Sequence, residues 1–464
     1  MEKDDVFTIF DDLRKRILNI DDKNPTPQNP NIRLTLMPMA LPVSGDQFRN
    51  PARPGDMTGA TDAETAKRKA AAYELSRFVD RKLLMDGSGQ FVPVGSLISE
   101  TWDGIVHAAT PAGDVPVQTE KTKARLDAAE AVLYTVKDGH TLMTPAFEDY
   151  KKYEKLYSDA LTAYSDKYNS LANTPHGLDN WPTAGRAAYL SVESAMDDWV
   201  TLGRKAEVSA ASDTLDAEGA NAVDYIIKKC RDTFESYQFA VADTGAKYAY
   251  TACIPQDWAE PMPGLTGWNN YSYRSTERRS EHSVETHNWG AHGGLSFGFF
   301  SIGGGGGGSS RTEHGEFDSQ ATGIRMSYGL VTIDRPWLRT ILLNIKGWGL
   351  SGQKAGVVSS GEAGQDKRDL DAFFLPSIPT HMIVIKQLGI YVGDQGQVLD
   401  ELTKHSGGGG GFGWGPFSLG GSTGDDSYKQ TVMSHMEDGW LVVDGAQVIG
   451  WVLEVTPRSP SEDA

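Results

Sequence analysis

Hydrophobic positions in the first half of the chain recur at alternating spacings of three and four residues. Between residues 119 and 240 this spacing places one run of tyrosines and leucines on a single stripe, and a second run of aromatic and aliphatic residues on another. The first stripe includes Tyr150, Tyr153, Tyr157, Leu161, Tyr164 and Tyr168, and the second includes Tyr189, Val192, Met196 and Trp199. Stripes of this period are the sides by which amphipathic helices pack. We therefore expect three or four antiparallel helices in this region.

Thr61 and Glu64 have the spacing of a capping box, and an apolar pattern of helical period follows them as far as residue 84. This pattern predicts a further helix of about six turns. The stretch before it, residues 21–56, is polar and rich in proline, so we expect an extended arm there.

From about residue 245 the hydrophobic period changes to two. In the segment 322–333, Ile324, Met326 and Tyr328 alternate with polar or small residues, as in a strand with one buried face. Residues 381–392 show the same alternation, although Lys386 interrupts the apolar face. The sequence thus predicts an α+β protein in which an antiparallel helical bundle precedes a β-sandwich-like domain. We expect three parts, namely an N-terminal segment and arm (1–57), a bundle (58–245) and a β-rich domain (246–464).

A glycine-rich motif occurs twice in the β-rich part. Residues 295–304 (LSFGFFSIGG) align with residues 412–421 (FGWGPFSLGG), and each copy is followed by an apolar strand pattern that ends in Asp334 or Asp444. We interpret the two copies as a duplicated hairpin unit. Glycine alternating with large apolar residues leaves one face of a strand bare, so that another backbone or surface can approach it closely.

The apolar residues of these hairpins are the candidate contacts for self-assembly or for a membrane. They are Leu295, Phe297, Phe299, Phe300, Ile302, Ile324, Met326, Tyr328, Phe412, Trp414, Phe417 and Leu419. Residues 293–302 and 322–332 are each about as long as a bilayer-spanning strand. The charge-dense segment 275–290 argues against insertion, because its charges would fall on both faces of a strand.

Net charge, the N-terminal sequence and the cysteine content limit the classes of function and partner that this chain can have. A formal charge of -18 repels phosphate groups, so we expect no nucleic acid partner. The N-terminus lacks a secretory signal pattern, and no apolar run reaches the length of a membrane-spanning helix, so we expect a cytoplasmic protein. The two cysteines, Cys230 and Cys253, are expected as buried thiols rather than as a disulfide or a metal site.

The chemistry-bearing residues form no recognised catalytic motif. His282, His287, His292 and His314 form the densest group of histidines, but their spacing fits no compact metal motif, and neither glycine run is followed by the residues of a phosphate-binding loop. We predict no catalytic residues, metal or cofactor. Tryptophans beside glycines keep sugar binding open as an alternative.

From these features we expect a non-catalytic protein that forms homo-oligomers through its glycine-rich β domain. The first alternative is a pore-forming or membrane-active protein that inserts amphipathic β-hairpins. A metal-dependent enzyme or a carbohydrate-binding protein is a further alternative.

Overall fold

The structure is a computed structural model of the 464-residue chain. It describes residues 3–21, 27, 31–48, 51–53, 61–85, 91–111, 120–137, 140–172, 181–218, 222–240, 247–263, 267–277, 300–303, 313–314, 323–362, 373–393, 411–414, 416–423 and 430–461.

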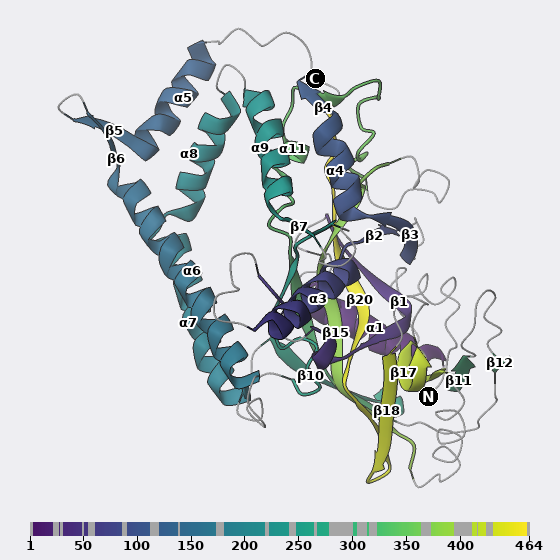
Figure 1. Ribbon diagram of the computed structural model, residues 1–464. Coiled ribbons are helices and arrows are strands. Elements are labelled where there is room, and N and C mark those ends of the chain that lie inside the picture. The colour runs from purple at the N-terminus through teal and green to yellow at the C-terminus, as the bar shows by residue number, and fades with distance from the viewer. Residues whose placement is uncertain are drawn as a thin grey trace.

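A twisted antiparallel sheet forms the centre of the molecule (Figure 1). Its strands, in spatial order, are β9 (Ala252–Ile254) and β10 (Trp268–Arg274) along one side of β13 (Gly323–Asp334), then β15 (Ser377–Tyr391), then β19 (Trp440–Asp444) and β20 (Ala446–Val455). β19 and β20 follow each other along one edge of β15 and are separated only by Gly445. Its φ of +100° is a conformation that favours glycine, and there β19 and β20 acquire different outer neighbours.

On one side of Gly445, β20 pairs with β1 (Ile32–Val43). The prediction of an arm without regular structure was therefore wrong for this segment, which forms a strand of the sheet. Its alternating apolar residues Leu34, Leu36 and Ala40 are buried, and the register shift between Leu36 and Leu41 accommodates a proline in the strand. Proline is tolerated at such an irregularity because it has no N–H to donate to the ladder.

On the other side of Gly445, the sheet continues from β19 through short strands. They are β18 (Gln430–Glu437), β17 (Phe417–Thr423), β16 (Gly411–Trp414), β11 (Phe300–Gly303) and β12 (Glu313–His314). β17 returns to β1, where Ala40 N donates a hydrogen bond of 2.6 Å to Pro416 O.

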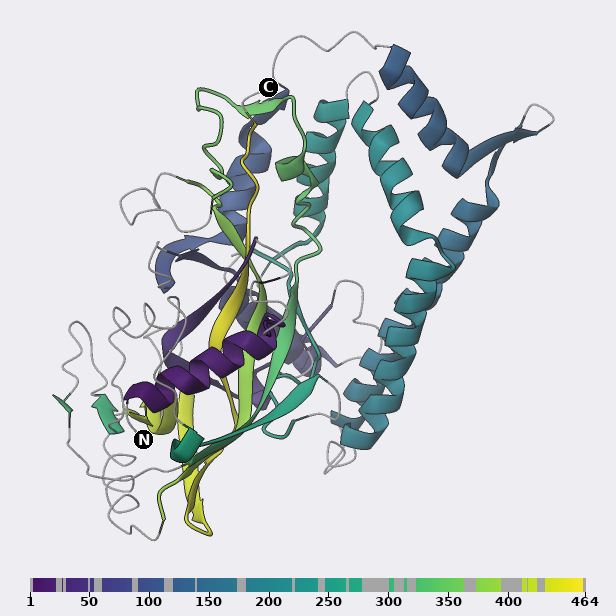
Figure 2. The same cartoon turned by 180° about the vertical axis from the view of Figure 1, so that it is seen from behind.

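Both faces of the sheet are covered. Helix α1 (Lys3–Ile17) lies across one face, as Figure 2 shows, and packs Val6, Ile9, Phe10 and Leu13 into the core. Helix α3 (Asp62–Val79) covers the other face, with α2 (Gly45–Phe48) beside it.

The capping box that begins α3 is confirmed. Glu64 N donates to Thr61 Oγ1 at 3.3 Å, and Thr61 N donates to Glu64 Oε2 at 3.0 Å. The helix is shorter than predicted, because it ends at Val79. The next residues form strand β2 (Arg81–Met85), which pairs with β3 (Phe91–Leu97).

The remaining described helices lie outside the central sheet and pack mainly on one another (Figure 1). They are α4 (Ile98–Ala108), α5 (Glu120–Leu133), α6 (Pro145–Ala172), α7 (Trp181–Thr201), α8 (Lys205–Glu218), α9 (Ala222–Ser236) and α11 (Ile341–Asn344). Short two-stranded pairings accompany them: β4 (Ala109–Pro111) with β14 (Trp348–Leu350), β5 (Tyr134–Lys137) with β6 (His140–Met143), and β7 (Gln238–Ala240) with β8 (Lys247–Ala249). α4, α9 and α11 share a separate core that includes the buried thiol of Cys230.

The predicted aromatic stripes form the seam between α6 and α7. The rings of Tyr157 and Trp199 stack at 5.5 Å, and those of Tyr164 and Trp181 lie 5.4 Å apart. One end of this helical pair is attached to the turn segment that follows β9, since Trp181 Nε1 donates to the carboxylate of Asp257 at 2.9 Å.

The α+β class is confirmed. The finer prediction, a helical bundle followed by a β-sandwich, is not. Its segments interleave, because β1 lies in the sheet formed by the C-terminal half and α1 and α3 cover that sheet.

Candidate functional site

Two long insertions leave the central sheet at the same end. Arg274 pairs with Gly323 at the end of the β10–β13 ladder, and Tyr391 pairs with Trp440 at the end of the β15–β19 ladder. Gly323 and Tyr391 pair with each other, so both hairpins open at one level of the sheet. The spans between these paired positions, residues 275–322 and residues 392–439, are equal in length, and the second contains β16, β17 and β18, which themselves pair in the sheet.

The sequence repeat has the same position in both insertions. Leu295 is as far along the chain from Arg274 as Phe412 is from Tyr391. The insertions also pair with each other, since β11 lies beside β16 with Ser301 opposite Gly413. The two spans thus share their length and the placement of the motif, and the duplicated hairpin unit stays a prediction.

Glycines make room for a large ring where the insertions begin. A Cβ at Gly389 would lie 2.9 Å from Arg325 Nε and 3.3 Å from the Trp440 ring. Trp440 also contacts Tyr391, with ring centroids 5.2 Å apart, and the Arg325 guanidinium lies 4.5 Å from its centroid. Gly389 thus leaves room for Arg325 and Trp440 of the same chain, whereas the bare strand face predicted for the glycine-rich motifs at 295–304 and 412–421 stays a prediction.

The predicted contact residues in the described strands are interior residues. Ile324, Met326, Tyr328, Trp414, Phe417 and Leu419 are all buried in the core under α1. Phe300, Ile302 and Phe412 lie in β11 and β16, of which the structure describes the backbone. Leu295, Phe297 and Phe299 lie outside the described residues. The predicted contact residues whose side chains are described thus lie together in the interior of one chain rather than on a contact surface.

The first hairpin unit is here β10, β13 and the span between them, and the second is β15, β19 and the span between them. Helix α1 contacts both units. Phe10 meets Phe417 of the second unit edge to face at 6.4 Å. The hydroxyl of Tyr273, in the first unit, donates to the buried carboxylate of Asp5 at 2.6 Å, and Tyr271 donates to Asp12 at 3.1 Å. Sequence reasoning missed this helix as a site element, although its apolar positions already had helical spacing.

A buried lysine lies on the other side of the sheet. Lys386 is 1% exposed, donates to the carbonyls of Asp257 at 2.8 Å and Met262 at 3.1 Å, and lies 4.0 Å over the Trp268 ring. Burial lowers the pKa of Lys386 to about 8, and the Asp257 carboxylate opposes that shift. The lysine attaches the segment before β10 to β15. The interruption of the apolar pattern at this position was its signal in the sequence.

A second buried polar group joins α3 to α4. Asp80 accepts hydrogen bonds from Ser99 N at 2.9 Å and from the Ser99 hydroxyl, while Arg335 donates to Val79 O at 2.7 Å. Burial raises the pKa of Asp80 to about 6, although Ser99 and Arg335 oppose the shift. This group caps the first turn of α4, and nothing in the local sequence indicated it, because its partners are distant along the chain.

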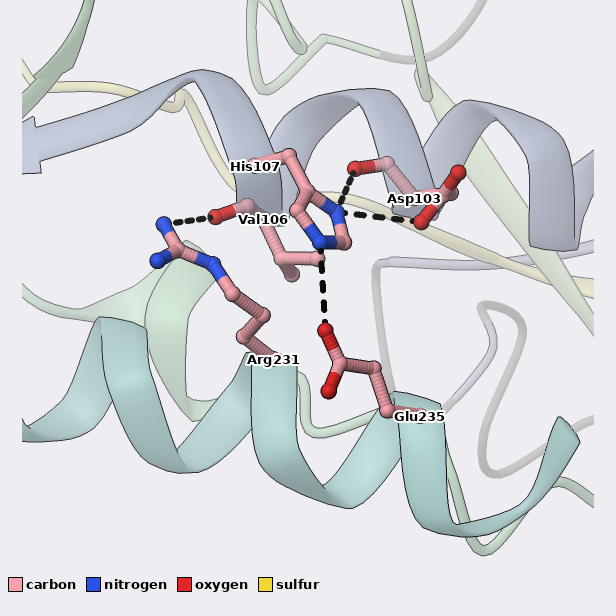
Figure 3. A network of polar contacts seen from close by, with 5 residues as sticks. All are labelled: Asp103, Val106, His107, Arg231 and Glu235. Carbon is pink, nitrogen blue, oxygen red and sulfur yellow. Dashed lines mark hydrogen bonds and ion pairs between the residues drawn. The ribbon is translucent and has the colours of Figure 1, made fainter.

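Figure 3 shows His107 of α4 between two carboxylates, with Nδ1 3.0 Å from Asp103 Oδ1 and Nε2 3.4 Å from Glu235 Oε1. The imidazole is 45% exposed, so these contacts are solvated pairs that link α4 to α9. Arg231 adds a hydrogen bond of 3.0 Å to Val106 O. Within the described ranges, no group of three or more His, Cys, Asp or Glu residues could hold a metal ion. His282, His287 and His292 lie outside those ranges, and His314 ends β12.

Among the described helices, none is both long enough and apolar enough to cross a membrane. Comparison with family models, with curated proteins and with solved structures found no match to this chain.

Proposed function

We propose that this protein is non-catalytic and membrane-active: it self-associates, and its two glycine-rich insertions extend from the sheet as β-hairpins that enter a bilayer. The observation that carries the proposal is the presence of two insertions of equal length at one level of one sheet. Two hairpins that must reach the same depth require this equality, whereas unrelated surface loops do not.

The first insertion begins and ends beside the paired residues Arg274 and Gly323, so further pairing continues the β10–β13 ladder. In the second span, β18 already pairs with β19 through the turn at Asp438 and Gly439, so extension of the β15–β19 ladder requires β18 to leave β19. Each span has room for two strands of about 20 residues and a turn, and a strand crosses the hydrocarbon core with about 9–11 residues.

Charge distribution along the insertions supports the same interpretation. The apolar glycine-rich motifs lie in the middle of each span, which is the tip of an extended hairpin. The charge-dense segment 275–290 follows β10 directly and would lie at the base. In such a hairpin, the charges that argued against insertion would lie in the part that stays in water.

Self-assembly without a membrane is the second candidate. Among the described strands, β10 pairs on one side only, with β13, so its other edge is open to a strand of another copy. Such an edge gives a ring or a filament, depending on whether the rotation between copies closes.

A reversible cross-link tests the proposal. Ile302 of β11 lies opposite Phe412 of β16, and cysteines at both positions would bridge the two insertions. Both native thiols are buried, so they do not compete. We expect the oxidised Ile302→Cys/Phe412→Cys protein to release no dye from liposomes, and release to return after reduction.

The single variants Ile302→Cys and Phe412→Cys are the controls, and both are expected to release dye under oxidising conditions. Unchanged release by a fully cross-linked sample would contradict hairpin extension. If the wild-type protein forms regular particles in plain buffer by light scattering and negative-stain imaging, and releases no dye, the second candidate replaces the first.

A further inference from the structure

A polar groove lies on the sheet beside the point where both insertions begin. It has a volume of about 470 Å³ and is lined by side chains of β10, β13, β15, β18 and β19. The polar residues among them are Asn270, Ser272, Arg325, Ser327, Gln387 and Glu437. We infer that this groove binds a neutral saccharide, an inference that rests on the proposed membrane activity and names what holds the protein on its target surface.

The groove is shaped by an irregularity in β15. The register between β13 and β15 shifts between Arg325 and Ser327, so β15 carries an extra residue there. Gln387, in this bulge, has a φ of +51°, which residues other than glycine, asparagine and aspartate rarely adopt. A bulge re-aims side chains and is common beside binding sites. The strained backbone places the Gln387 amide in the groove.

Hydrogen-bonding capacity in the groove is only partly used. Ser327 Oγ donates to Asn270 Oδ1 at 2.9 Å, and Gln387 Nε2 contacts Met262 Sδ at 3.4 Å. Within the described part of the chain, the amide N–H groups of Asn270, the Gln387 carbonyl and the Ser272 hydroxyl have no protein partner. These donors and acceptors alternate within one concave surface, which is what neighbouring sugar hydroxyls require.

Charge selects among ligand classes. Among the described residues that line the groove, the charged ones are Arg325 and Glu437, and they form an ion pair of 3.4 Å. The groove therefore has no net charge to attract a phosphate or an ammonium group. The aromatic pair of Trp440 and Tyr391 lies next to the groove but is not part of its lining, and the Arg325 guanidinium lies 4.5 Å from the Trp440 ring centroid.

The groove lies between strands of both hairpin units, so a saccharide bound there would contact both. β10 and β13 belong to the first hairpin unit, and β15, β18 and β19 belong to the second. A saccharide on the target surface would contact both units where their insertions begin, and would hold that end of the sheet toward the bilayer.

Gln387→Gly is the decisive variant, because glycine adopts a positive φ without strain but has no amide side chain. Binding is measured by calorimetry with methyl glucoside, methyl galactoside, methyl mannoside and N-acetylglucosamine up to about 100 mM, the range in which single sugars bind weakly. We expect saturable binding of at least one probe by the wild-type protein, a loss of about tenfold or more in Gln387→Gly, and a melting temperature in that variant equal to or above that of the wild-type protein.

Thr332→Ala, in β13 but outside the groove, is the matched control and is expected to bind as the wild-type protein does. Absence of saturable binding to all four probes, or equal binding by Gln387→Gly, would overturn the inference. Dye release from liposomes without glycolipid is measured separately, so a protein that binds sugar but releases no dye retains the inference and loses the proposed function.

Discussion

Gln447 of β20 and the main chain of Ser418 of β17 exchange two hydrogen bonds inside the core. Gln447 Oε1 accepts from Ser418 N at 3.0 Å, and Gln447 Nε2 donates to Ser418 O at 2.7 Å. Both residues are buried, at 2% and 1% exposure. The glutamine amide thereby bridges β20 and β17 through the same pair of hydrogen bonds that a neighbouring strand would make. The bridge lies close to Gly445, which separates β19, paired with β18, from β20, paired with β1.

Replacing Gln447 with leucine should destabilise the protein by about 2–4 kcal/mol, because it leaves both main-chain groups of Ser418 buried without partners. Urea denaturation measures the loss. Ser418→Ala is the control, since it removes only the hydroxyl bond of 3.3 Å to Ala40 O and should cost about 1 kcal/mol. Equal losses in the two variants would show that the glutamine bridge adds nothing.

Gly329 and Gly104 should respond to alanine with opposite signs. A Cβ at Gly329 would lie 2.8 Å from the carbonyl oxygen of Gly267 and 3.0 Å from the Trp268 ring, so Gly329→Ala should destabilise by about 1–3 kcal/mol. A Cβ at Gly104, within α4, meets nothing within 4 Å, and Gly104→Ala should stabilise by about 0.5–1 kcal/mol. Melting temperatures that move in the same direction would contradict the packing around Gly329.

The parts of this fold that could be predicted from sequence depend on local periodicity. The seam of α6 and α7, the capping box at Thr61 and the strand pattern of β13 and β15 each involve residues within a few positions of one another. The segment 32–43 was misassigned because its prolines break the strand pattern locally, whereas its pairing with β20 depends on residues more than four hundred positions away.

The candidate site could be predicted only in part for the same reason. The repeat itself was visible, because it is a similarity of short segments. The pairing of Gly323 with Tyr391, and of Tyr391 with Trp440, could not be predicted, because it depends on which strands lie side by side in the sheet. Burial of Trp414 and Phe417 under α1 is likewise a consequence of tertiary packing, which turns residues predicted as surface contacts into core.

Asp80 should make stability depend on pH in the mildly acidic range. Its folded-state pKa, about 6, lies above the ordinary value of 3.8, so the folded protein binds the proton more tightly than the unfolded chain. The resulting stabilisation is complete below about pH 4 and is lost as the pH rises through 6, by roughly 3 kcal/mol. Asp80→Asn should remove this slope in urea denaturation between pH 4 and 6, and the exposed Asp103→Asn should keep it. A wild-type slope that survives in Asp80→Asn would assign the pH dependence to other groups.

Helix α1 should hold the two hairpin units in place. Phe10→Ala removes the ring that meets Phe417 and should destabilise by about 3–5 kcal/mol. Because α1 covers β16 and β17, the amides of residues 411–423 should exchange hydrogen faster in this variant, and under the proposed function dye release should be faster too. Hydrogen exchange by mass spectrometry and liposome leakage measure the two effects.

Phe78→Ala is the matched control for α1, because Phe78 is equally buried but packs on the opposite face of the sheet, against Trp258 and Trp451. We expect a similar loss of stability in Phe78→Ala with unchanged exchange in residues 411–423 and unchanged leakage. The comparison separates a helix that restrains the hairpin units from one that only completes the core. If both variants accelerate exchange and leakage alike, global destabilisation explains the result and α1 has no specific restraining role.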